Sequence, residues 1–206
     1  MIQTAMKVSA RVISWLFHPL LMPTLGLLIL LNSGTYISLL DPAAKRAILF
    51  VMALGTLLFP LIMVPVFYYR NLVTGIQQAS REERLIPMLI VTILYIITLV
   101  YFLRLPLNRI IHSYALAITL SVFLLLVASY WYNLSGHMTG LGGMTGLIIA
   151  LVLLYGTPLM GLLILTLLAS GLTGTAILWL KEHRSGEIYT GYLLGFAVVL
   201  TTLLLY

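Results

Sequence analysis

Long apolar runs separated by short polar stretches make up most of this chain. Stretches of about 18 or more mainly apolar residues form helices that span a bilayer, and the runs here have that length. They are predicted at about residues 12–31, 45–69, 81–103, 110–131, 138–155, 159–180 and 188–206. The pattern therefore predicts an all-α fold, a polytopic transmembrane helical bundle with six or seven spanning helices.

Prolines interrupt the first of these runs, which contains His18-Pro19 and Pro23. Proline lacks a backbone N–H and kinks a helix. We therefore expect this run to be bent or only partly inserted, and the number of spanning helices depends on it. If all seven runs span, the N-terminus lies on the same membrane face as the start of the fifth run.

The fifth run opens with a dense set of glycines, at Gly140, Gly142, Gly143 and Gly146. In lipid, helices associate through van der Waals contact rather than through the hydrophobic effect, and small residues let their backbones approach closely. We expect the fifth helix to pack closely against a neighbour.

The composition agrees with a membrane location. The chain is 62% hydrophobic and 8% charged, and its mean hydropathy is +1.13, which a water-soluble domain of this length would not tolerate at its surface. The spanning runs leave no room for a second domain, so residues 1–206 are expected to form a single integral membrane domain. We expect a multi-pass protein of the bacterial inner membrane, in contact with the lipid bilayer.

The charge balance and the absence of cysteine limit the partners and the chemistry. The net charge is +6 and the chain has no cysteine. An excess of Lys and Arg in a membrane protein reflects cytoplasmic loops and anionic head groups, and no basic surface remains for a nucleic acid. Disulfides, thiolate metal sites and a cysteine nucleophile are excluded. We expect no nucleic-acid partner, metal or other cofactor, and the oligomeric state stays open.

Three polar islands interrupt the runs, at residues 70–87, 132–140 and 180–187. Two spanning runs separate each island from the next, so all three are predicted at one membrane face. Ser80 and Glu83 predict a capping box at the start of the third helix. Ionisable groups near lipid are costly and tend to mark function. The candidate site residues in the islands are Arg81, Arg84, Ser135, Gly136, His137, Lys181, His183, Arg184 and Glu187.

These residue types together fit phosphoryl transfer. Two arginines can hold a phosphate through bidentate hydrogen bonds, and Ser135 with the amides at the start of the fifth helix can donate to the same anion. One histidine can attack phosphorus while the other protonates the leaving oxygen. Glu187 lies four residues after His183, on the same face of a helical turn, and can orient its imidazole.

Two islands resemble motifs of the type 2 phosphatidic acid phosphatase superfamily, whose members are membrane-embedded lipid phosphatases. Residues 134–137, Leu-Ser-Gly-His, are similar to the family's Pro-Ser-Gly-His motif. His183, followed after three residues by Glu187, is similar to the His and Asp that end the family's third motif. The resemblance covers about residues 70–195.

The resemblance implies a role for each matching residue. His183 would be the nucleophile that forms a phosphohistidine, oriented by Glu187. His137 would be the acid that releases the lipid alcohol, and Ser135 would bind phosphate together with an arginine of the first island. The implied substrate is a lipid phosphate or polyprenyl diphosphate, hydrolysed without a metal.

The chain departs from the family in its other motifs. Ala176-Ile177 stands where the family has Ser-Arg, and the first island lacks the family's lysine and Arg-Pro pair. Losing one preorganised donor lowers a rate on the order of 10²-fold. Either Lys181 or Arg184 therefore substitutes, or the enzyme is slow or inactive.

Other interpretations stay open at this point. A catalytically impaired relative would bind lipid phosphate or a membrane partner. An intramembrane serine protease would pair Ser135 with His183. The islands can also be purely structural, with Ser135 as a helix cap and the charges as solvated loops. His18 and His112 have no partner at metal-ligand spacing and are expected to be structural, interfacial or gating residues.

Overall fold

The structure, a computed structural model, describes residues 2–63 and 81–205, and the side chains of residues 6–63 and 85–205. Seven spans in these ranges are long and apolar enough to cross a membrane. The long helices are α1 (Ile2–Leu16), α2 (Met22–Leu31), α3 (Pro42–Ala53), α5 (Arg81–Arg104), α6 (Arg109–Ser129), α7 (Gly136–Tyr155), α8 (Met160–Trp179) and α9 (Ser185–Leu205). The predicted all-α transmembrane bundle is confirmed, with seven spans, and the protein is an integral multi-pass membrane protein.

The first span is bent, as its prolines predict. It runs over Met6–Leu31 and comprises α1, a short 3-10 turn at Pro19–Leu21 and α2. The bend lies at His18, whose backbone is extended with φ −60° and ψ 136°, because a following proline disfavours the helical conformation. Nδ1 of His18 accepts a hydrogen bond from the amide of Leu20 at 3.3 Å, which closes the bend.

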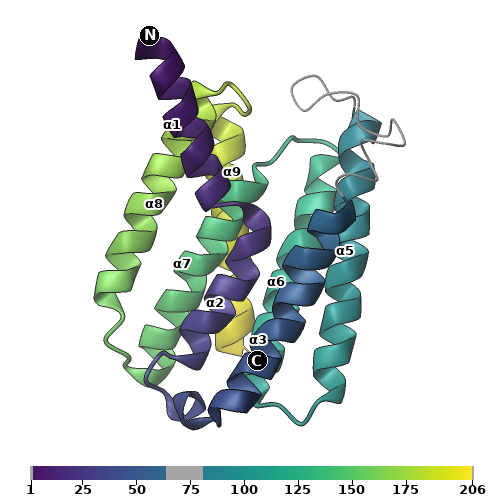
Figure 1. Ribbon diagram of the computed structural model, residues 1–206, viewed down its shortest axis with the longest axis vertical. Helices are drawn as coiled ribbons and strands as arrows, with labels where there is room; N and C mark the ends of the chain where they lie inside the picture. Colours follow the sequence, from purple (N-terminus) through teal and green to yellow (C-terminus); the bar gives the residue numbers. More distant parts are fainter. Residues whose placement is uncertain (1, 64–80, 206) are drawn as a thin grey trace.

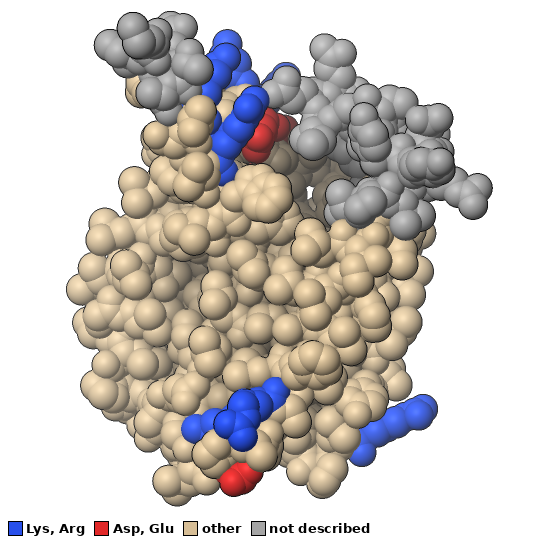
Figure 2. All heavy atoms as spheres, viewed as in Figure 1, with Lys and Arg blue, Asp and Glu red and all other residues tan. Residues whose placement is uncertain are grey.

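The chain begins at one end of the bundle and finishes toward the other (Figure 1). The N-terminus, the starts of α5 and α7 and the turn from α8 into α9 lie together at one end, which we call the motif end. This is the arrangement expected if all seven runs span. Basic side chains are visible at both ends of the molecule, and the middle of the face shown is uncharged (Figure 2).

The structure describes only part of the first polar island. The helix that follows it, α5, begins at Arg81 at the motif end. Ser80 and the side chain of Glu83, which would form the capping box, lie outside the described residues. The side chains of Arg81 and Arg84 lie outside them too.

Helix α7 is the central helix of the bundle. Of its span, 61% is buried inside the protein, compared with 22% for the spans of α3 and α5. It contacts α2, α6, α8 and α9. The helix that begins with the Ser-Gly-His sequence is therefore shielded from lipid along most of its length.

Helices α7 and α9 contact each other through glycines. A Cβ atom on Gly142 of α7 would overlap the carbonyl of Tyr192, and a Cβ on Gly195 of α9 would overlap the carbonyl of Thr139. Such contacts are possible only where backbones meet directly, which small residues allow in a membrane protein. The close packing predicted for the fifth run is confirmed, and it holds the start of α7 against the start of α9.

Candidate functional site

Ser135 caps α7 and fixes the position of His137. Its Oγ accepts a hydrogen bond from the amide of Met138 at 3.5 Å, and the residue is fully buried. A serine that accepts from the amide three residues on is a favoured N-cap. Helix α7 consequently begins at Gly136, two residues earlier than the sequence suggested, and His137 lies in its first turn.

His183 is held by two acceptors on the same ring nitrogen. Nδ1 lies 3.0 Å from Oε2 of Glu187 and 3.1 Å from the carbonyl oxygen of Asn133. The same carboxylate oxygen accepts from the amide of Arg184 at 3.0 Å, so the carboxylate is also fixed. Both side chains are largely buried, at 16% exposure for His183 and 13% for Glu187. The predicted pairing of His183 with Glu187 is thus present in the structure.

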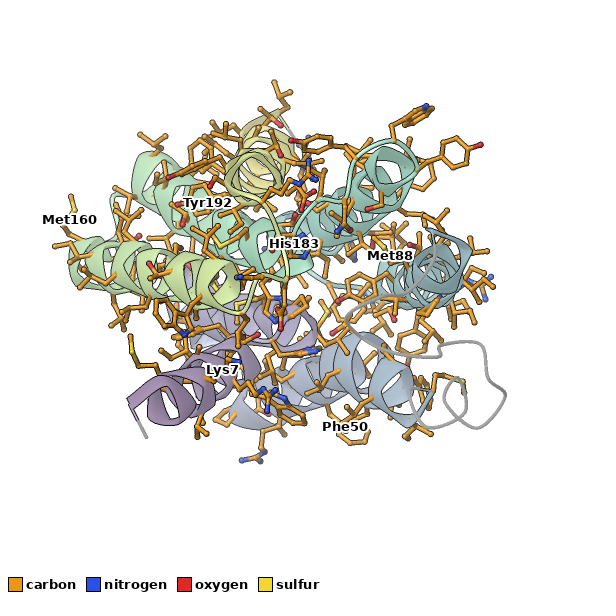
Figure 3. All side chains as sticks on the ribbon, turned by 90° about the horizontal axis from the view of Figure 1, so that it is seen from above. Lys7, Phe50, Met88, Met160, His183 and Tyr192 are labelled. Atoms are coloured by element: carbon orange, nitrogen blue, oxygen red, sulfur yellow. The ribbon has the colours of Figure 1, made fainter. Side chains whose placement is uncertain are left out.

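Backbone contacts join the second and third islands. The amide of Ser135 donates to the carbonyl of Glu187 at 3.3 Å, and a Cβ on Gly191 would lie 2.8 Å from the carbonyl oxygen of Ser135. His183 in turn contacts the carbonyl oxygen of Asn133, four residues before His137. The two islands that carry these histidines therefore lie side by side as one cluster, and His183 lies near the middle of the bundle seen from above (Figure 3).

The first span adds two residues to this cluster. Oγ of Ser14 lies 3.1 Å from Nε2 of His137. The ring of His18 packs edge-on against the ring of His137, with centroids 5.6 Å apart. Sequence reasoning considered His18 without a partner and did not consider Ser14. The spacing of polar residues along α1 was the signal that could have identified them, because Ser14 lies on the same helical face as Lys7 and Arg11.

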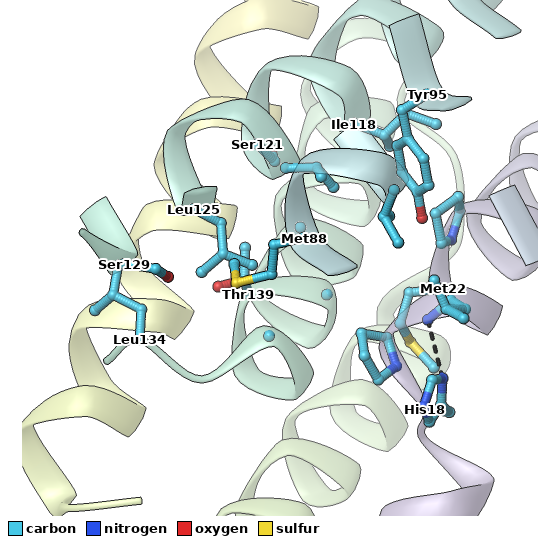
Figure 4. A pocket seen from close by; sticks show the side chains of 18 of the residues that line it. His18, Met22, Met88, Tyr95, Ile118, Ser121, Leu125, Ser129, Leu134 and Thr139 are labelled. Atoms are coloured by element: carbon cyan, nitrogen blue, oxygen red, sulfur yellow. Dashed lines mark hydrogen bonds between the residues drawn. The ribbon is translucent and has the colours of Figure 1, made fainter. Parts of the chain in front are cut away.

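A cavity of about 470 Å³ extends from this cluster into the bundle (Figure 4). In this view His18 and Met22 lie on one side of the cavity, Leu134 and Ser129 lie on the other, and Tyr95 and Ile118 lie toward its upper end. The lining residues come mainly from α2, α5, α6 and α7, and most are apolar. The histidines His18 and His183 both contribute to its wall. The volume is within the range of small-molecule sites, about 300–1,000 Å³.

One polar atom in the cavity wall has no partner. The hydroxyl of Ser129 is buried and makes no hydrogen bond with any described residue. Figure 4 shows it turned toward Leu125 and Met88, into the cavity. Buried hydroxyls are normally hydrogen-bonded, so an occupant with a polar atom at this depth would satisfy it.

The predicted phosphate-binding residues are not all brought to the cavity. Gly136 lines it, whereas Ser135 is fully buried behind it as the helix cap. Lys181 and Arg184 are exposed on the turn between α8 and α9 and are not among the lining residues. The contribution predicted for the arginines of the first island stays a prediction, because their side chains are outside the described ranges.

The described contacts support neither a metal site nor a serine protease pair. Within residues 6–63 and 85–205, no three His, Cys, Asp or Glu side chains are grouped so as to hold a metal ion. The Ser135 hydroxyl makes no described hydrogen bond to His183, as a serine protease pair would require. His112 lies in the first turn of α6, near the opposite end of the bundle, and its Nε2 has no partner among these residues.

Comparison of the chain with models of protein families, with curated proteins and with solved structures found no match.

Proposed function

We propose that this protein is a membrane-embedded hydrolase that removes phosphate from a lipid phosphate or polyprenyl diphosphate in the bacterial inner membrane. The reaction passes through a phosphohistidine on His183, and side chains rather than a metal ion carry the chemistry. The observation that carries the proposal is the pair of acceptors on Nδ1 of His183, at 3.0 Å and 3.1 Å.

Those two acceptors determine which nitrogen of His183 can react. A carboxylate and a carbonyl oxygen only accept hydrogen bonds, so Nδ1 must carry the proton. In the neutral ring, Nε2 then has a free lone pair and is the nucleophile. As Nε2 bonds to phosphorus, positive charge develops on the ring, and the Glu187 carboxylate stabilises it.

We assign the role of proton donor to His137, which lies in the second island beside the third. In the first step the P–N bond to His183 forms and the P–O bond to the leaving group breaks, while protonated His137 gives a proton to the leaving oxygen. The leaving group is the lipid alcohol of a lipid phosphate or the polyprenyl phosphate of a diphosphate. In the second step neutral His137 takes a proton from a water molecule that attacks phosphorus, and the P–N bond breaks. Ser14 engages Nε2 of His137, which leaves Nδ1 to exchange the proton.

The cavity supports an amphiphilic substrate. Its walls are mainly apolar, and two histidines stand at its edge. A hydrocarbon chain in the cavity exchanges its contacts with the bilayer for van der Waals contacts with the apolar wall. Its phosphate group then lies at the motif end beside His183 and His137.

Phosphate release from a panel of lipid phosphates and polyprenyl diphosphates by the purified protein tests this proposal. We expect release by the wild-type protein, an acid-labile protein-bound phosphate during turnover, and loss of both in His183→Ala. The matched control is His112→Ala, which removes a histidine distant from the cluster and should leave turnover intact. Unchanged activity in His183→Ala would refute the mechanism.

A non-catalytic protein that binds lipid phosphate is the second candidate. It is favoured by the absence of Lys and Arg from the described cavity lining and by Ala176-Ile177 in place of Ser-Arg. This candidate predicts that vanadate protects the protein against thermal unfolding while no substrate in the panel is hydrolysed.

A further inference from the structure

Helix α1 carries a polar stripe on an otherwise apolar surface. Lys7, Arg11 and Ser14 are spaced by four and three residues, which places them within about 60° of one another around a helix of 3.6 residues per turn. Apolar residues lie on the opposite side, where Val12 is 60% exposed and Leu16 is 63% exposed. The helix therefore presents different chemistry to the lipid and to the bundle.

The inner end of this stripe touches the candidate site. Ser14 is buried and forms a hydrogen bond with His137. His18, which follows the end of the helix, packs against the same imidazole. The direction of the stripe is thus fixed by contacts, and its outer members, Arg11 and Lys7, continue from the site toward the motif end.

The two cations of the stripe, Lys7 and Arg11, are not engaged in contacts with other charged or polar groups among the described residues. Lys7 and Arg11 are exposed, and neither forms a hydrogen bond or ion pair with the described part of the chain. Arg11 lies three residues before Ser14, a rise of about 4.5 Å along the helix, which is shorter than an extended arginine side chain. Its guanidinium can therefore reach an anion held beside His137.

A phosphate at the site requires such a cation. The described cavity lining contains neither Lys nor Arg, so the cation has to come from outside the lining. Lys181 and Arg184 on the turn into α9 are exposed, as are Lys7 and Arg11, but α1 also contacts His137 through Ser14. Guanidinium groups bind phosphate in a bidentate manner and retain their charge throughout.

We propose that α1 supplies the phosphate-binding cation of this protein. Arg11 binds the phosphate of the lipid directly, Lys7 adds positive charge one turn farther out, and Ser14 positions His137. This inference rests on the proposed lipid phosphate site, whether that site hydrolyses its ligand or only binds it.

The experiment measures binding and turnover separately. Binding of a non-hydrolysable long-chain alkyl phosphonate, and of the alcohol with the same chain, is measured for the wild-type protein, Arg11→Ala, Arg11→Lys and Arg46→Ala. Arg46 is the matched control because it is an exposed arginine at the opposite end of the bundle. We expect Arg11→Ala to weaken phosphonate binding about tenfold or more, the effect of one hydrogen bond to a charged group. Alcohol binding should not change, and Arg11→Lys should recover part of the affinity.

Each outcome separates this inference from the proposed function. Phosphonate binding that depends on Arg11, without hydrolysis of any substrate, supports the inference and rejects the hydrolase. Hydrolysis with the same KM in Arg11→Ala supports the hydrolase and overturns the inference. Equal losses of phosphonate affinity in Arg11→Ala and Arg46→Ala also overturn the inference, because a general effect of surface charge would then explain the result. The absence of phosphonate binding by the wild-type protein overturns it as well.

Discussion

Nδ1 of His183 donates its hydrogen to Oε2 of Glu187, 3.0 Å away. Four residues separate the two in sequence, and the amide of Arg184 donates to the same oxygen. The carboxylate is therefore held by the start of α9 itself, and it fixes the tautomer of the imidazole. A ring held in this way needs no substrate to orient it.

Replacing Glu187 with glutamine tests this arrangement. The amide keeps the size of the side chain but removes the negative charge that stabilises a positive imidazole. We expect kcat to fall by about 10²-fold to 10⁴-fold, as when the carboxylate of a catalytic triad is neutralised. The affinity for vanadate should change much less. The control is Glu182→Gln, an exposed residue on the same turn, and equal losses in the two variants would contradict the role of Glu187.

His137→Ala should affect substrates according to their leaving groups. A long-chain alkyl phosphate needs a proton on its leaving oxygen, so we expect kcat/KM to fall by about 10²-fold or more without the acid. Hydrolysis of 4-nitrophenyl phosphate should fall far less, because nitrophenolate leaves without a proton. His183→Ala, which lacks the nucleophile, should lose both activities. Equal losses for both substrates in His137→Ala would exclude His137 as the proton donor.

Filling the cavity should reduce the length of the hydrocarbon chain that the protein accepts in its substrate. Val122 lines the cavity from α6, and Val122→Trp would displace part of a bound chain. We expect a higher KM for a long-chain phosphate, because the excluded part of the chain loses its van der Waals contacts with the cavity wall. A phosphate with a short chain should be unaffected. Leu168→Trp, on the exposed face of α8, is the control. If Val122→Trp leaves the dependence on chain length unchanged, the chain binds elsewhere.

The glycine contacts between α7 and α9 should dominate stability. In Gly195→Ala the added methyl group overlaps the carbonyl of Thr139, and overpacking of this kind costs about 1–3 kcal/mol. In Gly171→Ala the methyl group meets open space, and removing a glycine from a helix interior contributes about 0.5–1 kcal/mol. We expect a lower thermal unfolding temperature for the first variant in detergent and an equal or higher one for the second. The same shift in both variants would show that the helices do not meet at Gly195.

The sequence predicted the features that depend on neighbours along the chain. Spanning helices follow from local hydropathy, the bend at His18 from the proline after it, and the cap at Ser135 from residue type and position. The pairing of His183 with Glu187 follows from a spacing of four residues. Each of these features is determined by residues that lie within one or two helical turns of one another.

The rest of the site depends on packing between helices that are distant in sequence. The contact of Ser14 with His137 joins residues 123 positions apart, and no local pattern reveals which helix lies beside α7. The cavity arises where side chains of α2, α5, α6 and α7 fail to fill the space between them, so it could not be read from any one segment. The role of Arg81 and Arg84 stays a prediction.

The direct backbone contact of α7 with α9 has a consequence for selectivity. Main-chain atoms, rather than adjustable rotamers, set the separation of the two turns that carry His137 and His183, so this side of the site cannot widen for a bulkier polar head. On the opposite side, His137 contacts the hydroxyl of Ser14 in α1 and the ring of His18 at the proline bend. For the proposed lipid phosphate, this backbone contact therefore limits the size of the head group that fits between the two turns.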